Sequence, residues 1–78
     1  MKTYVLRVSL AEEDDGRWSV WIDALPGCAA WGYTQDEAMR AIQDAAEIYL
    51  EDMREAGETL PESGIEIIDA PVVAVRVA

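Results

Sequence analysis

The feature that most constrains the fold is a compact run of motifs at residues 25–38. It begins with a Leu-Pro-Gly-Cys turn, passes through a short apolar stretch that ends at Gly32, and continues into Thr34-Gln35-Asp36-Glu37. Thr-x-x-Glu is the sequence of a capping box, in which two side chains satisfy free backbone N–H groups at a helix start. We therefore expect a tight turn, a short strand and a capped helix in that order.

Strands are predicted on both sides of this run, because apolar residues there recur at every second position. The first covers residues 4–10, and the second covers residues 18–23 after an acidic turn that ends in Asp15-Gly16, a strong hairpin signal. A third is expected at residues 28–33, a brief extended piece at 65–68 and a last strand at 72–77. Gly32 indicates a bulge or a close backbone approach.

The helix is predicted to be amphipathic and to end near Gly57, a natural residue for the position after a helix. Pro61 then prevents the helix from resuming. At about 100° per residue, one side is apolar and the opposite side is mostly charged. The predicted inner side consists of Ala38, Met39, Ile42, Ala45, Ala46, Tyr49, Leu50 and Met53.

These elements predict an α+β fold, a single small domain over residues 1–78 in the order β-β-β-α-β. One helix is packed on one face of a mixed sheet, and a last strand parallel to the first would require a right-handed crossover. The other sheet face carries Trp21 and Val72, which is unfavourable in water. We predict a partner or oligomer interface there, formed by Val5, Arg7, Trp21, Val72 and Arg76.

Composition narrows the possible partners. A chain of 78 residues has a marginal core, and with one cysteine and no histidine it lacks a disulfide or an ordinary zinc site to stabilise it. We therefore expect a homo-oligomer, a dimer or tetramer, and no cofactor. The net charge of −10 disfavours direct nucleic-acid binding and favours a basic protein partner. No membrane-length apolar run occurs, which predicts a cytoplasmic protein.

The residues do not predict an enzyme. Without histidine, Ser-His and Cys-His catalysis are excluded, and Cys28 has no basic neighbour in sequence, so it is expected to be a small core residue. The carboxylates gather in the turn at 12–15 and on the outer helix face, which indicates a solvated surface rather than a two-metal site.

Motif order across nearly the whole chain resembles the HicB family, the antitoxin half of a bacterial toxin–antitoxin pair. The residues that match are fold-shaping ones, in the first hairpin, the turn, the helix entry and the helix exit. They are Gly16, Trp18, Leu25, Pro26, Gly27, Cys28, Gly32, Thr34, Glu37, Ala38, Gly57 and Pro61.

The resemblance implies a truncated ribonuclease H-like fold without catalytic carboxylates. It also implies a partner, HicA, a small basic ribonuclease that cuts messenger RNA with a histidine and whose active site the antitoxin masks. Asp44, Glu47 and Glu51 on the outer helix face are predicted to steer such a toxin. Many members carry a DNA-binding tail; because this chain ends at Ala78, directly after the last predicted strand, we expect none.

Two alternatives stay open. The chain is either a toxin-neutralising protein or an orphan oligomerising interaction domain without a toxin. A nuclease is a third and weaker hypothesis. A neighbouring gene for a small, basic, histidine-bearing protein would distinguish the first from the second.

Overall fold

The computed structural model describes residues 2–59 and 71–77. The described elements are β1 (Lys2–Arg7), β2 (Ser9–Glu12), β3 (Trp18–Trp21), β4 (Ala29–Gly32), α1 (Gln35–Glu55) and β5 (Val72–Val77). β1 and β2 are the two halves of the predicted first strand, divided at Val8, so the predicted α+β class and element order are confirmed. The extended piece predicted at 65–68, and Pro61, lie outside the described residues.

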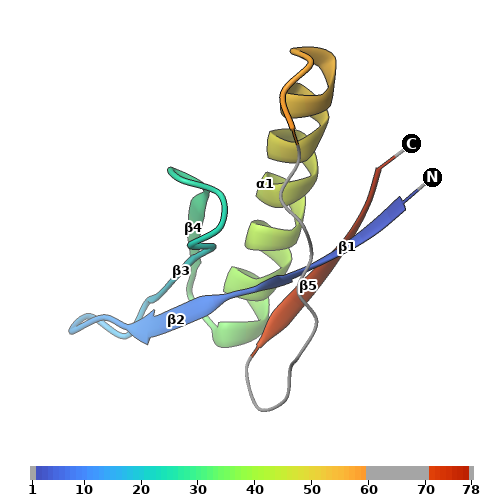
Figure 1. The fold of residues 1–78 in the computed structure, drawn as a ribbon. Coiled ribbons are helices and arrows are strands. Elements are labelled where there is room, and N and C mark those ends of the chain that lie inside the picture. Colours follow the sequence, from blue (N-terminus) through green and yellow to red (C-terminus); the bar gives the residue numbers. More distant parts are fainter. Residues whose placement is uncertain (1, 60–70, 78) are drawn as a thin grey trace.

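The described strands form two antiparallel sheets, which corrects the prediction of one mixed sheet. β1 pairs with β5, with Val5 opposite Ala74, and β2, β3 and β4 form a meander with Trp21 between Ser9 and Ala29. β5 runs antiparallel to β1, so the right-handed crossover that a parallel last strand would require is not needed. Figure 1 shows β1 leading into β2, and the start of β1 lies beside the end of β5, where Lys2 is opposite Val77.

The core lies between α1 and the inner faces of both sheets. Ala38, Ile42, Ala46 and Leu50 of α1 are completely buried, and the other four predicted inner positions pack around them. The alternation predicted for the strands is confirmed, since Tyr4, Leu6 and Val8 point into this core. Among the described residues, every buried side-chain nitrogen or oxygen has a hydrogen-bond partner.

The helix entry follows the capping prediction with one change. The Thr34 hydroxyl accepts a hydrogen bond from the Glu37 backbone N–H at 3.1 Å. The Glu37 carboxylate accepts from the backbone N–H of Tyr33 at 3.0 Å, one residue before the expected N-cap donor. Both free N–H groups are satisfied, and the carboxylate lies at the positive end of the helix dipole.

The helix exit is a Schellman motif centred on Gly57. The backbone N–H of Glu58 donates to the carbonyl of Met53, and that of Gly57 donates to Arg54. Gly57 has φ +77°, a left-handed conformation that glycine adopts without steric cost. The predicted helix end is therefore confirmed.

Two glycines determine how the chain passes from β3 to α1. Gly27 has φ +83° in the turn before β4. Gly32 allows β4 to approach the helix, because a Cβ there would lie 2.5 Å from the backbone nitrogen of Ala38. The close approach predicted at Gly32 is confirmed.

We predict that Gly27→Val lowers the free energy of unfolding by about 1–3 kcal/mol, because a β-branched residue is strained at this φ. A Cβ at Gly27 meets nothing within 4 Å, so the loss comes from the backbone alone. Chemical denaturation measures it, and Gly27→Asn is the matched control because asparagine tolerates left-handed φ better. Equal stability of the valine variant and the wild type would contradict this role.

Candidate functional site

The two sheets each have an outer face, on the side away from the core, and we call the two outer faces together the sheet face. Its residues alternate along each strand with the buried ones. Across the strands, Arg7 lies opposite Val72, and Trp21 lies opposite Ser9. Trp21 is 37% exposed and Val72 is 39% exposed, although both are large apolar residues. Within the described residues no helix or strand covers this surface, as the contacts of α1 are with the inner side.

The five residues predicted for the interface are all on the sheet face, but they do not form one cluster. Arg7, Val5 and Val72 are close neighbours on β1 and β5, whereas Arg76 lies opposite Thr3 toward the chain ends. Trp21 belongs to the other sheet. The surface is therefore elongated.

Trp31 and Tyr33 extend this surface and were missed in the sequence. Trp31 lies opposite Ser19 and is 51% exposed, and Tyr33 is 69% exposed. Their rings meet edge to face with centroids 5.1 Å apart, and the Arg17 guanidinium lies 5.1 Å from the Trp31 ring centre. Alternation along the strand was the available signal. Gly32 faces the helix, so its neighbour Trp31 lies on the opposite side.

The first hairpin positions Arg17 for this contact. Gly16 turns the chain with φ +90°, and Arg17 then forms a 2.7 Å ion pair with Asp15. The Arg17 backbone N–H also donates to the Asp15 carboxylate at 3.0 Å. This backbone hydrogen bond is the main cause that holds the pKa of Asp15 below its usual value, followed by the guanidinium contact.

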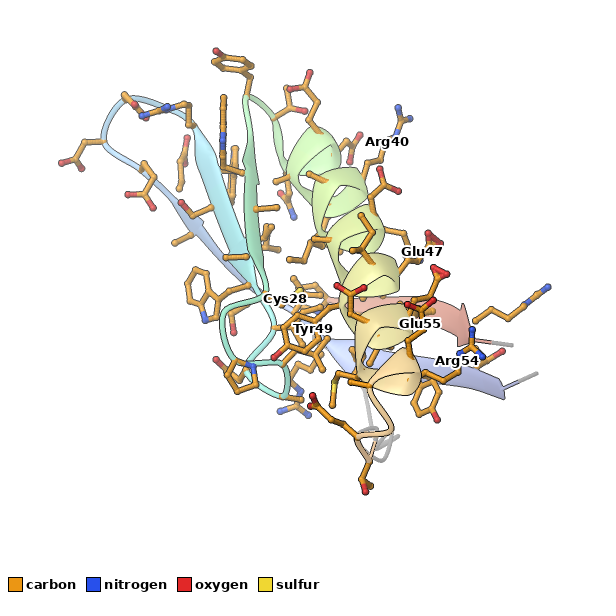
Figure 2. The ribbon with its side chains drawn as sticks, turned by 90° about the horizontal axis from the view of Figure 1, so that it is seen from above. Cys28, Arg40, Glu47, Tyr49, Arg54 and Glu55 are labelled. Atoms are coloured by element: carbon orange, nitrogen blue, oxygen red, sulfur yellow. The ribbon has the colours of Figure 1, made fainter. Side chains whose placement is uncertain are left out.

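The second candidate surface is the acidic outer side of α1. Asp44, Glu47 and Glu51 are all exposed and follow the spacing i, i+3, i+7, so they share one stripe. Figure 2 shows Glu47 and Arg40 pointing away from Cys28 and Tyr49, which lie on the side of the helix that faces the turn before β4. The sequence also missed Ile48, which is 62% exposed beside this stripe.

Cys28 is a core residue, with only 5% of its side chain exposed. Burial raises the pKa of its thiol above the ordinary value, which disfavours the nucleophilic thiolate. In the described part of the chain, no three of the histidine, cysteine, aspartate and glutamate side chains gather as they would to hold a metal ion.

We predict that iodoacetamide alkylates Cys28 slowly in the native protein and much faster after denaturation. Only in the unfolded chain is the thiol accessible and its pKa no longer raised by burial. The raised pKa also means that Cys28 favours the native state below the pKa of the unfolded thiol, and that this contribution is lost as the pH rises through the native pKa. Mass spectrometry across a denaturant series at pH 8 measures the rate. Rapid native labelling would contradict the buried placement.

Comparison with known proteins identifies the class. A profile of the HicB_like antitoxin of bacterial toxin–antitoxin systems matches residues 4–71. The UPF0150 protein Ta0767 of Thermoplasma acidophilum is 34% identical over 61 residues, which cover 78% of this chain and 88% of that protein. A UPF0150 protein of Archaeoglobus fulgidus is 30% identical over 64 residues, covering 80% of this chain and 88% of that protein.

The fold agrees with this match. The crystal structure of the N-terminal domain of the Burkholderia pseudomallei antitoxin HicB superposes with a TM-score of 0.73 at 20% identity, covering 95% of this chain and 98% of that domain. The longer HicB structure from the same organism gives 0.69 at 21% identity, covering 99% of this chain and 64% of that one.

The fold is thus that of a small antitoxin domain. The chain belongs to the HicB-like antitoxin family, as the resemblance predicted. Membership implies a toxin partner in general terms and suggests a role without catalysis. No helix among residues 2–59 and 71–77 is both long and apolar enough to cross a bilayer.

Proposed function

We propose that this protein is an antitoxin that binds a small basic ribonuclease of the HicA type and blocks its access to messenger RNA. The observation that carries the proposal is the family match over residues 4–71. Charge supports it, because a chain with a net charge of −10 attracts a basic protein and repels RNA. The test is co-expression with any small basic protein that a neighbouring gene encodes, which should relieve growth arrest caused by that protein alone.

In this proposal the acidic side of α1 steers the toxin. Asp44, Glu47 and Glu51 are exposed carboxylates on one stripe, and exposed charges act mainly on the rate of encounter. Their field is screened over about 10 Å at 0.1 M salt. A buried apolar contact, by contrast, governs dissociation and depends little on salt.

We predict that association with the basic toxin slows as salt rises, while dissociation changes little. The triple variant Asp44→Asn, Glu47→Gln, Glu51→Gln should associate roughly 10-fold more slowly at low salt and approach the wild-type rate at high salt, because only steering is lost. Stopped-flow mixing from low to high salt measures both rates. An association rate independent of salt would contradict steering, and tight RNA binding by the chain alone would contradict the function.

We also propose that the chain is a homo-oligomer that associates through the sheet face at Val5, Arg7, Trp21, Val72 and Arg76. Support comes from exposed apolar area on a short chain without a disulfide. Trp21 and Val72 are both more than a third exposed, and Trp31 adds to the same surface. β5 supplies a second possible contact, because β1 is its only strand neighbour among the described residues.

We predict that Trp21→Ala weakens self-association by about 2 kcal/mol, roughly 30-fold, since large aromatic side chains dominate interfaces. Sedimentation at micromolar concentration measures the oligomer. Ile48→Ala is the matched control, because it removes exposed apolar area from the helix instead. A wild-type chain that sediments as a clean monomer would contradict the proposal, and unchanged association of the Trp21 variant would assign contact to the β5 edge.

An orphan interaction domain is the second candidate function, and the uncovered sheet face favours it if no toxin gene lies nearby. In either case we propose that residues 1–78 act as one domain, in the cytoplasm, without catalysis and without direct nucleic-acid binding. The lack of histidine and the burial of Cys28 support a role without catalysis. Descent from a ribonuclease H-like fold stays a prediction of the family resemblance.

A further inference from the structure

A groove lies between the start of β4 and one side of α1. Its walls are Gly27, Cys28 and Ala29 on the strand side and Ala45, Ile48, Tyr49 and Asp52 on the helix side, with a volume of about 310 Å³. The Tyr49 hydroxyl donates to the carbonyl of Pro26 at 2.7 Å, which ties the two walls together. Figure 2 shows Tyr49 beside Cys28 between the helix and the turn.

Ile48 makes this groove unusual. Its side chain is 62% exposed, although isoleucine is among the residues most often buried. Side chains three and four positions away are its neighbours on the helix surface. Those that carry charge are Asp44, Glu51 and Asp52, all exposed and all acidic. Asp52 is itself part of the groove, whereas Asp44 and Glu51 neighbour Ile48 along the helix, so the surroundings of Ile48 are acidic and hold no cation at these positions.

We propose that this groove receives a long cationic side chain, lysine or arginine, from the basic toxin. The aliphatic stem packs on Ile48 and Ala45, and the charged head lies against Asp52. Lysine and arginine bury their stems along apolar surface while the head stays near solvent and carboxylates. An apolar or acidic side chain would leave Asp52 desolvated without a partner. This inference rests on the proposed function and names the chemistry of its contact.

The chain itself is a poorer source of that side chain. Arg17 is engaged with Asp15 and the Trp31 ring, and Arg7 and Arg76 lie on the sheet face. This chain has 6 cationic against 16 acidic residues, whereas a basic protein has an excess of cationic side chains, so the basic protein is the better source. The remaining cations of the chain are Lys2, Arg40 and Arg54.

The experiment compares variants in their complex with any small basic protein that a neighbouring gene encodes. Ile48→Ala and Asp52→Asn should each speed dissociation roughly 10-fold, because each removes one half of the contact. Glu47→Gln is the matched control: it removes the same charge from the same helix but is not part of the groove, so it should change association only. Circular dichroism verifies that each variant is folded, which the exposure of all three side chains favours.

A second measurement follows the Ile48 δ1 methyl signal, which should shift when the basic protein is added. If the complex forms but the Ile48 and Asp52 variants dissociate at the wild-type rate, the groove is not the contact, and the antitoxin function still stands. If no complex forms, both proposals fail. If Ile48→Ala instead abolishes self-association in sedimentation, the occupant is a second copy and the inference is wrong.

Discussion

The approach of β4 to the first turn of α1 is the contact on which the rest of the structure depends. A Cβ at Gly32 would lie 2.5 Å from the backbone nitrogen of Ala38, so only glycine permits this distance. Because the strand and the helix start are so close, Ala38 is completely buried, and the helix continues along the core with Ile42, Ala46 and Leu50 inward. One helix thereby covers the inner faces of two sheets, and the outer faces are left to other contacts.

Local chemistry made much of this predictable. Thr34, Glu37 and Gly57 identified both ends of the helix, because capping bonds depend on residues within a few positions of one another. The pairing of distant strands was less accessible. The break at Val8 lets one predicted strand serve two sheets, and the direction of β5 depends on where the chain returns after the helix rather than on its own alternation.

On the candidate surfaces too, some residues could be placed from the local sequence pattern and others only from the packing of distant segments. Alternation was enough to place Trp21 and Val72 on the outer face. Trp31 was missed because its strand is only four residues long and its partner, Ser19, is determined by the length of the turn between β3 and β4. Ile48 was missed because a helix residue between the apolar and charged sides is assigned only when the neighbouring strand wall is known. The acidic stripe was predicted, but the groove lined by Ile48 and Asp52 was not.

Charge is sorted between the two surfaces. Arg7, Arg17 and Arg76 are on or beside the sheet face, in a chain with 6 cationic and 16 acidic residues, whereas Asp44, Glu51 and Asp52 surround Ile48 on the helix. Because Arg17 is paired with Asp15, the clearer difference is on the helix, where a basic partner is attracted to the carboxylates around Ile48. The acidic side of α1 points away from the core, as do the outer faces of the sheets, so we expect a second copy on the sheet face to leave the acidic side of α1 accessible. If both proposals hold, self-association and toxin binding are compatible, and the complex would contain one toxin for each antitoxin chain, so the molar mass of the complex tests both surfaces together.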